Sequence, residues 1–315
     1  MVIANVDTLP PRWQRGVSLA RLTTWRIGGP AAFVSHPRDR QELRDDLELA
    51  ARLALPVFAI GAGSNLLFPD DGYPGLLVRL PSGGVTAADG GALPSARESE
   101  SDAVRARCPA GAPLPRVVRR LARLGWAGLE WAEGIPGTVG GAVVNNAGAF
   151  GGQIASALDS AEVWMPPDAP LAQSAADLGL AYRHSRLKGD EPTRAFILSA
   201  CFRLERGRPD ELAACMAEIR ARRRQRAPRE PSCGSVFRNP PGCAAGKLIA
   251  QAGLMGMRIG GAQISTRHAN YIVNRGAASA AEVLELIALT RERVRATSGI
   301  ELELEVQMVG FAGKR

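Results

Sequence analysis

Two glycine-rich segments contain residues that could hold an anionic ligand. The first is Gly61, Ala62, Gly63, Ser64 and Asn65, directly after an expected strand at 57–60. A turn of this kind can point main-chain N–H groups into one concavity and hold a phosphate. It is not a dinucleotide-binding fingerprint, because position 66 is Leu where that motif needs Gly. On its own, such a segment is more often a plain tight turn.

The second segment covers residues 134–149. Its first eight residues hold four glycines, one proline and one threonine, a composition that cannot form a sturdy helix or strand interior. The simplest interpretation is a loop. The density of glycine favours another, in which the backbone is kept bare so that a flat or pyrophosphate-bearing ligand can approach closely.

Ser235 is a third candidate for chemistry. It lies in irregular chain between Pro231 and Pro240, where a hydroxyl can be presented rather than used as a helix cap. A nucleophilic serine needs a partner base, and no G-x-S-x-G context surrounds this one. From these residues alone, a structural serine is the better interpretation.

Composition excludes some classes of function. The chain has 315 residues, 46% hydrophobic, with a formal charge of +8, so a mainly disordered protein is excluded. Only three of its 39 basic residues are lysines, and the arginines are spread along the chain. We therefore discount nucleic-acid binding. The one dense cluster of arginines lies at the C-terminal end of an expected helix at 209–226, where positive side chains complement the helix dipole. We expect these arginines to form a solvated face, although an anionic ligand could bind there. The cluster consists of Arg220, Arg222, Arg223, Arg224 and Arg226.

Cysteine and histidine usage predicts a protein of a reducing compartment. Five cysteines form no C-x-x-C pair, and three histidines are too scattered to suggest a metal site. There is no signal-peptide pattern and no run of roughly 18 apolar residues. We expect a soluble cytoplasmic protein.

Local patterns predict elements that would position these segments. Helices are expected at 39–53 behind an Asp39 cap, at 113–124 and at 280–298, where Ser279 and Glu282 form a capping box and Gly299 ends the helix. Strands are expected at 57–60, 76–78, 160–165 and 195–204. Residues 81–107 are expected to form a long polar loop or hairpin. The alternation of apolar and polar residues at 301–309 predicts a half-buried strand. This mixture indicates an α+β protein, in three lobes.

Eight short segments, in this order, resemble those of one family. They are Thr24-Trp25-Arg26-Ile27-Gly28-Gly29, the glycine-rich segments at 61–65 and 134–149, Tyr182-Arg183-His184-Ser185, Gly234 to Pro240, Ala245-Gly246-Lys247-Leu248-Ile249, Gly260-Gly261-Ala262-Gln263-Ile264-Ser265, and Leu302-Glu303-Leu304-Glu305-Val306. In them the chain resembles the UDP-N-acetylenolpyruvoylglucosamine reductase (MurB) family, in its shorter subclass without an extra tyrosine-bearing loop.

The resemblance implies a two-lobed FAD-binding region of the PCMH or vanillyl-alcohol-oxidase type, plus a third α+β lobe that binds substrate. The implied divisions are 1–80 for the first FAD-binding lobe, 81–205 for the second and 206–300 for the substrate lobe, with a strand in 301–315 returning to the active site. It also implies small-molecule partners only (a UDP-sugar enolpyruvyl ether and NADPH), without nucleic acid or membrane, and a monomer or weak dimer.

The resemblance assigns roles to particular residues. Non-covalent FAD would take a hydride from NADPH and pass it to the terminal carbon of the enolpyruvyl group. Arg183 would offer planar donors to the substrate carboxylate, Ser235 would protonate the enolate, and Glu305 would poise the developing charge. Implied FAD contacts are Gly61, Ala62, Gly63, Ser64, Asn65, Gly134, Ile135, Pro136, Gly137, Thr138, Gly140, Gly141, Asn146 and Gly148. Implied substrate contacts are Tyr182, Asn239, Lys247 and Gln263.

Other interpretations stay open on the residues themselves. Arg183 could be one more surface arginine, and Glu305 shares the expected solvent face of its strand with Glu301 and Glu303. The two glycine-rich segments would also suit a flavin oxidase of a small alcohol or hydroxy acid. The net positive charge would also suit a non-catalytic binder of nucleotide sugars or nucleic acid. The chain departs from the family's usual residues at Asn145, Gln153, Met255 and Gln307.

Overall fold

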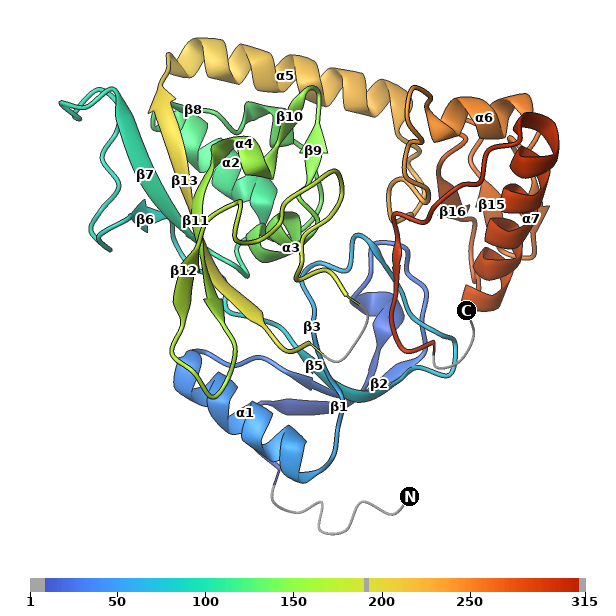
Figure 1. Cartoon of the computed structure of the whole chain (residues 1–315), viewed down its shortest axis with the longest axis horizontal. Coiled ribbons are helices and arrows are strands. Elements are labelled where there is room, and N and C mark those ends of the chain that lie inside the picture. The colour runs from blue at the N-terminus through green and yellow to red at the C-terminus, as the bar shows by residue number, and fades with distance from the viewer. Residues whose placement is uncertain (1–8, 190–192, 312–315) are drawn as a thin grey trace.

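The computed structural model describes residues 9–189 and 193–311 (Figure 1). Its first sheet has the order β1-β2-β5-β3, in which β1 and β2 are antiparallel and β5 runs parallel to both of its neighbours. Its strands are β1 (Trp13–Ser18), β2 (Pro30–Ser35), β5 (Tyr73–Val78) and β3 (Val57–Ala59). The short 3₁₀ helix η2 (Leu19–Arg21) follows β1. The expected strands at 57–60 and 76–78 are confirmed within this sheet.

Helix α1 (Arg40–Arg52) lies against this sheet at the bottom of Figure 1. Its predicted cap is confirmed, because the Asp39 carboxylate accepts a hydrogen bond of 2.9 Å from the main-chain N–H of Glu42. The helix is tied to the sheet through the fully buried Asp46, which accepts hydrogen bonds from the Trp13 indole and the Ser35 hydroxyl.

The second sheet has the order β12-β11-β13-β7-β6, with β8 also paired to β13. Its strands are β12 (Leu171–Gln173), β11 (Leu158–Trp164), β13 (Phe196–Arg206), β7 (Ala103–Pro109), β6 (Thr86–Ala87) and β8 (Trp126–Ala127). Strands β6 and β7 pair antiparallel, so the segment at 81–107 is a hairpin rather than one long loop. Expectations for strands at 160–165 and 195–204 are confirmed by β11 and β13.

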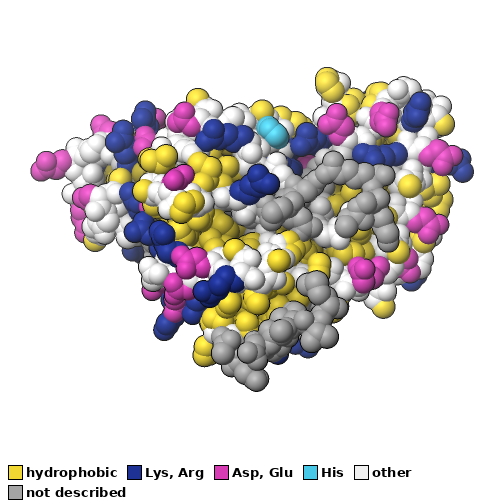
Figure 2. Space-filling view, turned by 60° about the horizontal axis from the view of Figure 1, so that its bottom comes forward, with side chains coloured by type: hydrophobic (Ala, Val, Ile, Leu, Met, Phe, Trp, Pro, Cys, Tyr) yellow, Lys and Arg dark blue, Asp and Glu magenta, His cyan; other side chains and the backbone are white. Residues whose placement is uncertain are grey.

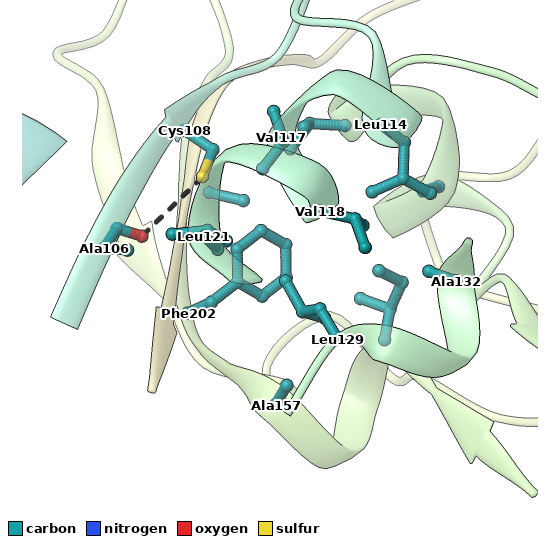
Figure 3. Packing of buried hydrophobic residues seen from close by; sticks show 14 of the residues in the cluster. Ala106, Cys108, Leu114, Val117, Val118, Leu121, Leu129, Ala132, Ala157 and Phe202 are labelled. Carbon is teal, nitrogen blue, oxygen red and sulfur yellow. Dashed lines mark hydrogen bonds between the residues drawn. The ribbon is translucent and has the colours of Figure 1, made fainter. Parts of the chain in front are cut away.

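Helix α2 (Leu114–Arg123) packs on this sheet, and Phe202 of β13 lies among apolar side chains of the helix and the following turn (Figure 3). Burial of such aromatic and aliphatic groups is the main stabilising contribution to this part of the fold. The remaining short elements of the region are η3 (Glu130–Ala132), α3 (Val139–Val144), β9 (Gly148–Ala149), β10 (Gly152–Gln153) and α4 (Ile154–Ala157).

Helix α5 (Pro209–Arg226) runs along the top of Figure 1 and connects the second sheet to the third part of the chain. That part contains a small antiparallel sheet, β14-β15-β16, with helices beside it. Its elements are α6 (Ala245–Gln251), β14 (Arg258–Ile259), β15 (Ala262–Ile264), β16 (Ile272–Asn274) and α7 (Ala280–Ser298). The capping box at Ser279 and Glu282 and the left-handed Gly299 (φ 72°) confirm the predicted limits of α7.

The prediction of a continuous strand at 301–309 is wrong. Leu304 forms an isolated bridge with Phe237, and only β17 (Gln307–Met308) is a strand, parallel to β4 (Leu66–Leu67). The segment changes partner along its length: it first lies beside 236–238 and then pairs with β4, as the red trace that descends from α7 toward the blue segments shows (Figure 1). A two-residue alternation cannot register such a change, since it assumes one sheet throughout.

Among the described residues, no helix is both long enough and apolar enough to cross a membrane. Within the same residues, no group of three or more His, Cys, Asp or Glu side chains is arranged to hold a metal ion. The mixed helices and sheets confirm the predicted α+β class.

Candidate functional site

A cavity of about 810 Å³ lies where the two larger sheets and the C-terminal part of the chain meet. The glycine-rich segments at 61–65 and 135–148 form much of its wall, together with Arg183, Ser235 and Glu305. Gly61 and Glu305, which are 244 positions apart in the sequence, therefore face one hollow. This cavity brings together all three residues to which the family resemblance assigned catalytic roles.

The two glycine-rich segments pack against each other. A Cβ atom on Gly61 would lie 2.5 Å from the hydroxyl oxygen of Thr138, so only glycine leaves room for this approach. The Ser64 hydroxyl donates to the carbonyl of Pro136 at 3.0 Å. These contacts fix both turns at the cavity wall.

The turn at 61–65 has free donors. The main-chain N–H groups of Ala62, Gly63 and Ser64 donate to no atom of the described residues. Gly63 adopts φ +61° and could not carry a side chain, because a Cβ there would lie 2.2 Å from the carbonyl oxygen of Leu22. Unpaired N–H groups on a bare turn suit a pyrophosphate, whose oxygens accept hydrogen bonds.

Two of the predicted cofactor contacts lie outside the cavity wall. Asn146 is buried, and its side chain donates to the carbonyl of Ala181 at 2.8 Å and accepts from the N–H of Ala155 at 3.0 Å. Its position therefore orders the loop behind the wall. Gly134 adopts φ +74° beside Arg223 at the start of the second segment. The other predicted contacts line the cavity directly.

Ser235 and Glu305 are brought close by pairing of their chain segments. The N–H of Glu305 donates to the carbonyl of Val236 at 2.8 Å, and the N–H of Arg238 donates to the carbonyl of Glu303 at 2.9 Å. Asn270 holds the serine segment from the other side, since its amide bonds both the N–H and the carbonyl of Phe237. No sequence motif indicated this role of Asn270.

Arg183 and Glu305 form an ion pair, with 2.9 Å between Arg183 Nε and Glu305 Oε1. The Glu305 side chain is 15% exposed, so the interpretation that it shares a solvent face with Glu301 and Glu303 is wrong. Burial raises the pKa of Glu305, and the positive charges of Arg183, Lys188 and Arg238 oppose that rise. The Arg183 guanidinium also donates to the carbonyl of Gly148 at 2.7 Å, which joins it to the second glycine-rich segment.

Lys188 is a second site residue that sequence reasoning missed. Its Nζ donates to the main-chain carbonyls of Arg183 at 3.3 Å and Glu305 at 3.2 Å. Burial, followed by the positive charge of Arg238, lowers the pKa of Lys188 to about 8. The only available signal was its position five residues after Arg183 in a chain poor in lysine.

The arginine cluster of α5 divides between two environments. Arg222, Arg224 and Arg226 are exposed, as expected of a solvated face, but Arg223 lines the cavity, and burial lowers its pKa. Arg220 pairs with the buried Glu133 at 3.1 Å. On the face in Figure 2, Lys and Arg side chains are spread among Asp and Glu rather than gathered in one surface.

The predicted substrate contacts are not all in one place. Tyr182 and Asn239 line a second, smaller hollow of about 410 Å³, together with Arg238 and Glu303. Lys247 is exposed on α6 and lines neither hollow. The Gln263 amide donates to the carbonyl of Gly256 at 3.0 Å, a bond within the small third sheet region.

Three of the four departures from the family's usual residues are held by hydrogen bonds. The Gln307 side chain donates to the carbonyl of Gly189, and its N–H donates to the carbonyl of Asn65 at 3.0 Å, which anchors the terminal segment. Asn145 accepts from the Asn65 amide at 3.2 Å. The Gln153 side chain accepts a hydrogen bond from the Asn146 amide at 3.2 Å. Met255 is the fourth departure, and it is 42% exposed.

Comparisons with known proteins agree with this geometry. The family model of the UDP-N-acetylenolpyruvoylglucosamine reductase C-terminal domain matches residues 226–309, and that of an FAD binding domain matches 30–170. The UDP-N-acetylenolpyruvoylglucosamine reductase of Chloroflexus aggregans is 42% identical, covering 96% of this chain and 99% of the relative. That of Synechococcus sp. strain WH7803 is 46% identical, covering 95% and 93%. The crystal structure of the Thermus caldophilus reductase is 36% identical, with a TM-score of 0.77 over 95% of this chain and 99% of that one.

Proposed function

The chain belongs to the UDP-N-acetylenolpyruvoylglucosamine reductase family, and on that premise we propose that NADPH is its electron donor and that Arg183, Ser235 and Glu305 act on the enolpyruvyl group. The protein is an FAD-dependent oxidoreductase that reduces UDP-N-acetylenolpyruvoylglucosamine in peptidoglycan synthesis. The product of this reduction is UDP-N-acetylmuramate. The chemistry that bound FAD would supply here is hydride transfer from the nicotinamide to the enolpyruvyl carbon.

The glycine-rich segments are proposed to hold the cofactor. Main-chain N–H groups of Ala62, Gly63 and Ser64 would donate to the pyrophosphate, and the bare backbone around Gly140 and Gly141 would let the flavin ring approach. The cavity wall has the chemistry this requires, since it combines unpaired donors with a glycine-lined surface.

The proton chemistry is proposed for the other end of the cavity. Hydride addition at the terminal carbon places negative charge on the substrate as an enolate shared with its carboxylate. The planar guanidinium of Arg183 can bind that carboxylate through two N–H donors. Ser235 can then give its proton to the carbon bearing the ether oxygen, because an enolate is a much stronger base than water.

Glu305 is proposed to orient Arg183 and to limit the positive charge around it. The observation that carries the proposal is the 2.9 Å pair between these two residues, on the wall that also presents Ser235. Tyr182, Asn239, Lys247 and Gln263 are proposed to contact the sugar and diphosphate, with Tyr182 and Asn239 acting from the second hollow.

The division of the chain into lobes is also proposed. Residues 1–80 with 301–315, residues 81–205 and residues 206–300 would form the first FAD-binding, second FAD-binding and substrate lobes. Support comes from the sheets, each of which lies within one of these divisions, including the pairing of β17 with β4 in the first; only β13 passes a limit, by the single residue Arg206. We further propose that the protein acts in the cytoplasm as a monomer or weak dimer.

An anaerobic titration followed by visible absorbance tests the proposed function. NADPH should bleach the flavin bands, and enolpyruvyl-UDP-N-acetylglucosamine should restore them. Bleaching that this substrate does not reverse, but that a keto acid or ketone does, would favour the oxidase alternative. Failure of NADPH to bleach the bands, with NADH succeeding, would overturn the proposed donor.

A further inference from the structure

Lys188 joins two segments of the site that are far apart in the sequence. Its ammonium donates to the main-chain carbonyl of Arg183, five residues before it, and to that of Glu305, 117 residues after it. Both acceptors are main-chain oxygens, so neither bond uses the side chain of Arg183 or Glu305. Lys188 therefore contacts the backbone that carries both members of the ion pair and leaves their side chains free to face the cavity.

The two carbonyls are shared with other donors. The carbonyl of Glu305 also accepts from the Asn65 amide at 3.1 Å, and the carbonyl of Arg183 also accepts from Arg238 at 3.4 Å. Lys188 thus stands between the first glycine-rich turn, the segment of Arg183 and the terminal segment. Arg183 itself has φ +54°, a conformation that L residues rarely adopt and that needs support from its surroundings.

The residue type is informative in this chain. Thirty-six of its 39 basic residues are arginine, yet this half-buried position holds one of three lysines. An ammonium is a compact group with three rotatable donors, and it can bridge two carbonyls where a planar guanidinium has a fixed fork. Burial of the ammonium beside Arg183 and Arg238 is unfavourable, so its bonds to the two carbonyls offset a real cost.

We propose that Lys188 is a positioning residue, which holds the backbones of Arg183 and Glu305 so that their side chains meet as an ion pair beside Ser235. The proposal rests on the proposed function of that pair. It assigns Lys188 to the step in which the substrate is reduced and protonated, and not to the step in which the flavin is reduced.

Lys188→Met tests the proposal, because methionine keeps the length of the side chain and removes the donors. Each half-reaction is measured separately by rapid mixing without oxygen. Reoxidation of the reduced flavin by enolpyruvyl-UDP-N-acetylglucosamine should slow roughly 10–100-fold, as expected for loss of charged hydrogen bonds. Reduction by NADPH should stay within about threefold of the wild type, and the FAD content per chain should not change.

Arg203→Met is the matched control. It also removes one positive charge, but from an exposed side chain on β13 that pairs with Asp159 outside the cavity. Both of its half-reactions should match the wild type. If Lys188→Met does not retain FAD, Lys188→Gln, which replaces the ammonium by a neutral amide, takes its place with the same expected selectivity.

The pH profile gives a second readout. Arg183, Arg238 and Glu305 are the charged groups that act on Lys188, and its pKa of about 8 means that the ammonium is lost as the pH rises through that value. Wild-type reoxidation should therefore fall above about pH 8, and this decline should be absent from the Met or Gln variant.

Two results would overturn the inference. One is a variant that holds FAD and is reoxidised within about threefold of the wild-type rate. The other is a loss of equal size in both half-reactions, which would indicate general damage to the cavity. A wild-type protein that the enolpyruvyl substrate does not reoxidise would instead contradict the proposed function, so the two failures are distinguishable.

Discussion

The hydroxyl of Ser235 is a weak acid in water, so its proposed part in the reaction depends on the basicity of its acceptor. An enolate is basic enough to take this proton, whereas the nicotinamide step needs no proton from Ser235. The local chain supports presentation of the hydroxyl, because Gly234 before it adopts φ +84° and Val236 and Phe237 after it are buried. The serine is therefore held between a turn and two buried anchors.

Ser235→Ala should separate the two half-reactions. Reduction of the flavin by NADPH should proceed as in the wild type, while reoxidation by enolpyruvyl-UDP-N-acetylglucosamine should slow by at least roughly 100-fold, the usual contribution of a positioned general acid. Stopped-flow absorbance of the flavin measures both. Unchanged turnover in this variant would remove Ser235 from the mechanism.

The charge of Glu305 predicts an acid limit to the same half-reaction. Burial raises the pKa of this carboxyl, so as the pH falls it takes up a proton at a higher pH than an ordinary glutamate and loses its pairing with Arg183. Reoxidation should therefore decline on the acid side at a pH above the usual range of glutamate. In Glu305→Gln the rate should be lower throughout and should lack this decline; a variant with the wild-type acid limb would show that another group titrates.

At the scale of elements, the first glycine-rich turn combines two constraints at Gly63. Its φ of +61° is unfavourable for other residues, and a Cβ there would lie 2.2 Å from the main-chain oxygen of Leu22. Gly90 in the turn between β6 and β7 has the same kind of backbone, with φ +92°, but no atom within 4 Å of a Cβ. A comparison of alanine substitutions at Gly63 and Gly90 therefore separates the effect of the backbone conformation from the effect of close packing.

Gly63→Ala should therefore weaken FAD binding by more than about tenfold, because the backbone must shift and carry its free N–H groups with it. Gly90→Ala should bind FAD as the wild type does and lose only about 1 kcal/mol of unfolding free energy from the strained φ. Fluorescence titration of the apoprotein with FAD measures the affinity. Equal affinities in the two variants would mean that the turn at 61–65 does not hold the cofactor.

Elements whose limits are set locally could be predicted from the sequence. The caps of α1 and α7 depend on residues within a few positions of each other, and both lie where Asp39, Ser279 and Glu282 indicated. The terminal segment could not be predicted in the same way, because its partners at Phe237 and Leu66 lie 67 and 241 residues before the positions that pair with them. Glu305 was placed on a solvent face for this reason.

At the scale of the whole molecule, prediction of the site from the sequence meets the same limit, because long-range contacts leave no local pattern. Arg183, Ser235 and Glu305 could be named from a family resemblance, whereas their mutual contacts come from the packing of three distant segments. Lys188 and Asn270 have no motif of their own that reports their bonds to the backbones of Glu305 and Phe237. A residue that acts through long-range contacts with main chain leaves no local pattern to detect.

The third part of the chain is joined to the loops of the first sheet by polar side chains. Asp70, in the loop between β4 and β5, accepts hydrogen bonds from the first two N–H groups of α7, those of Ala280 at 2.7 Å and Ala281 at 3.1 Å. Asn274 donates to the carbonyl of Trp25 at 3.1 Å. The helix is thus capped by its own Ser279 and also by a carboxylate from the loop between β4 and β5.

Asp70→Ala tests how far this contact stabilises the whole molecule. Loss of a carboxylate from a helix N-terminus removes two charge-assisted hydrogen bonds and a favourable interaction with the helix dipole, so the free energy of unfolding should fall by about 1–2 kcal/mol. Asp71→Ala, which removes an exposed carboxylate from the next position, should change it by less than about 0.5 kcal/mol. Chemical denaturation of the two variants measures the difference. Equal stabilities would show that the capping box at Ser279 suffices for α7 and that the third part of the chain is held in place by buried apolar contacts around Trp25 and Leu67.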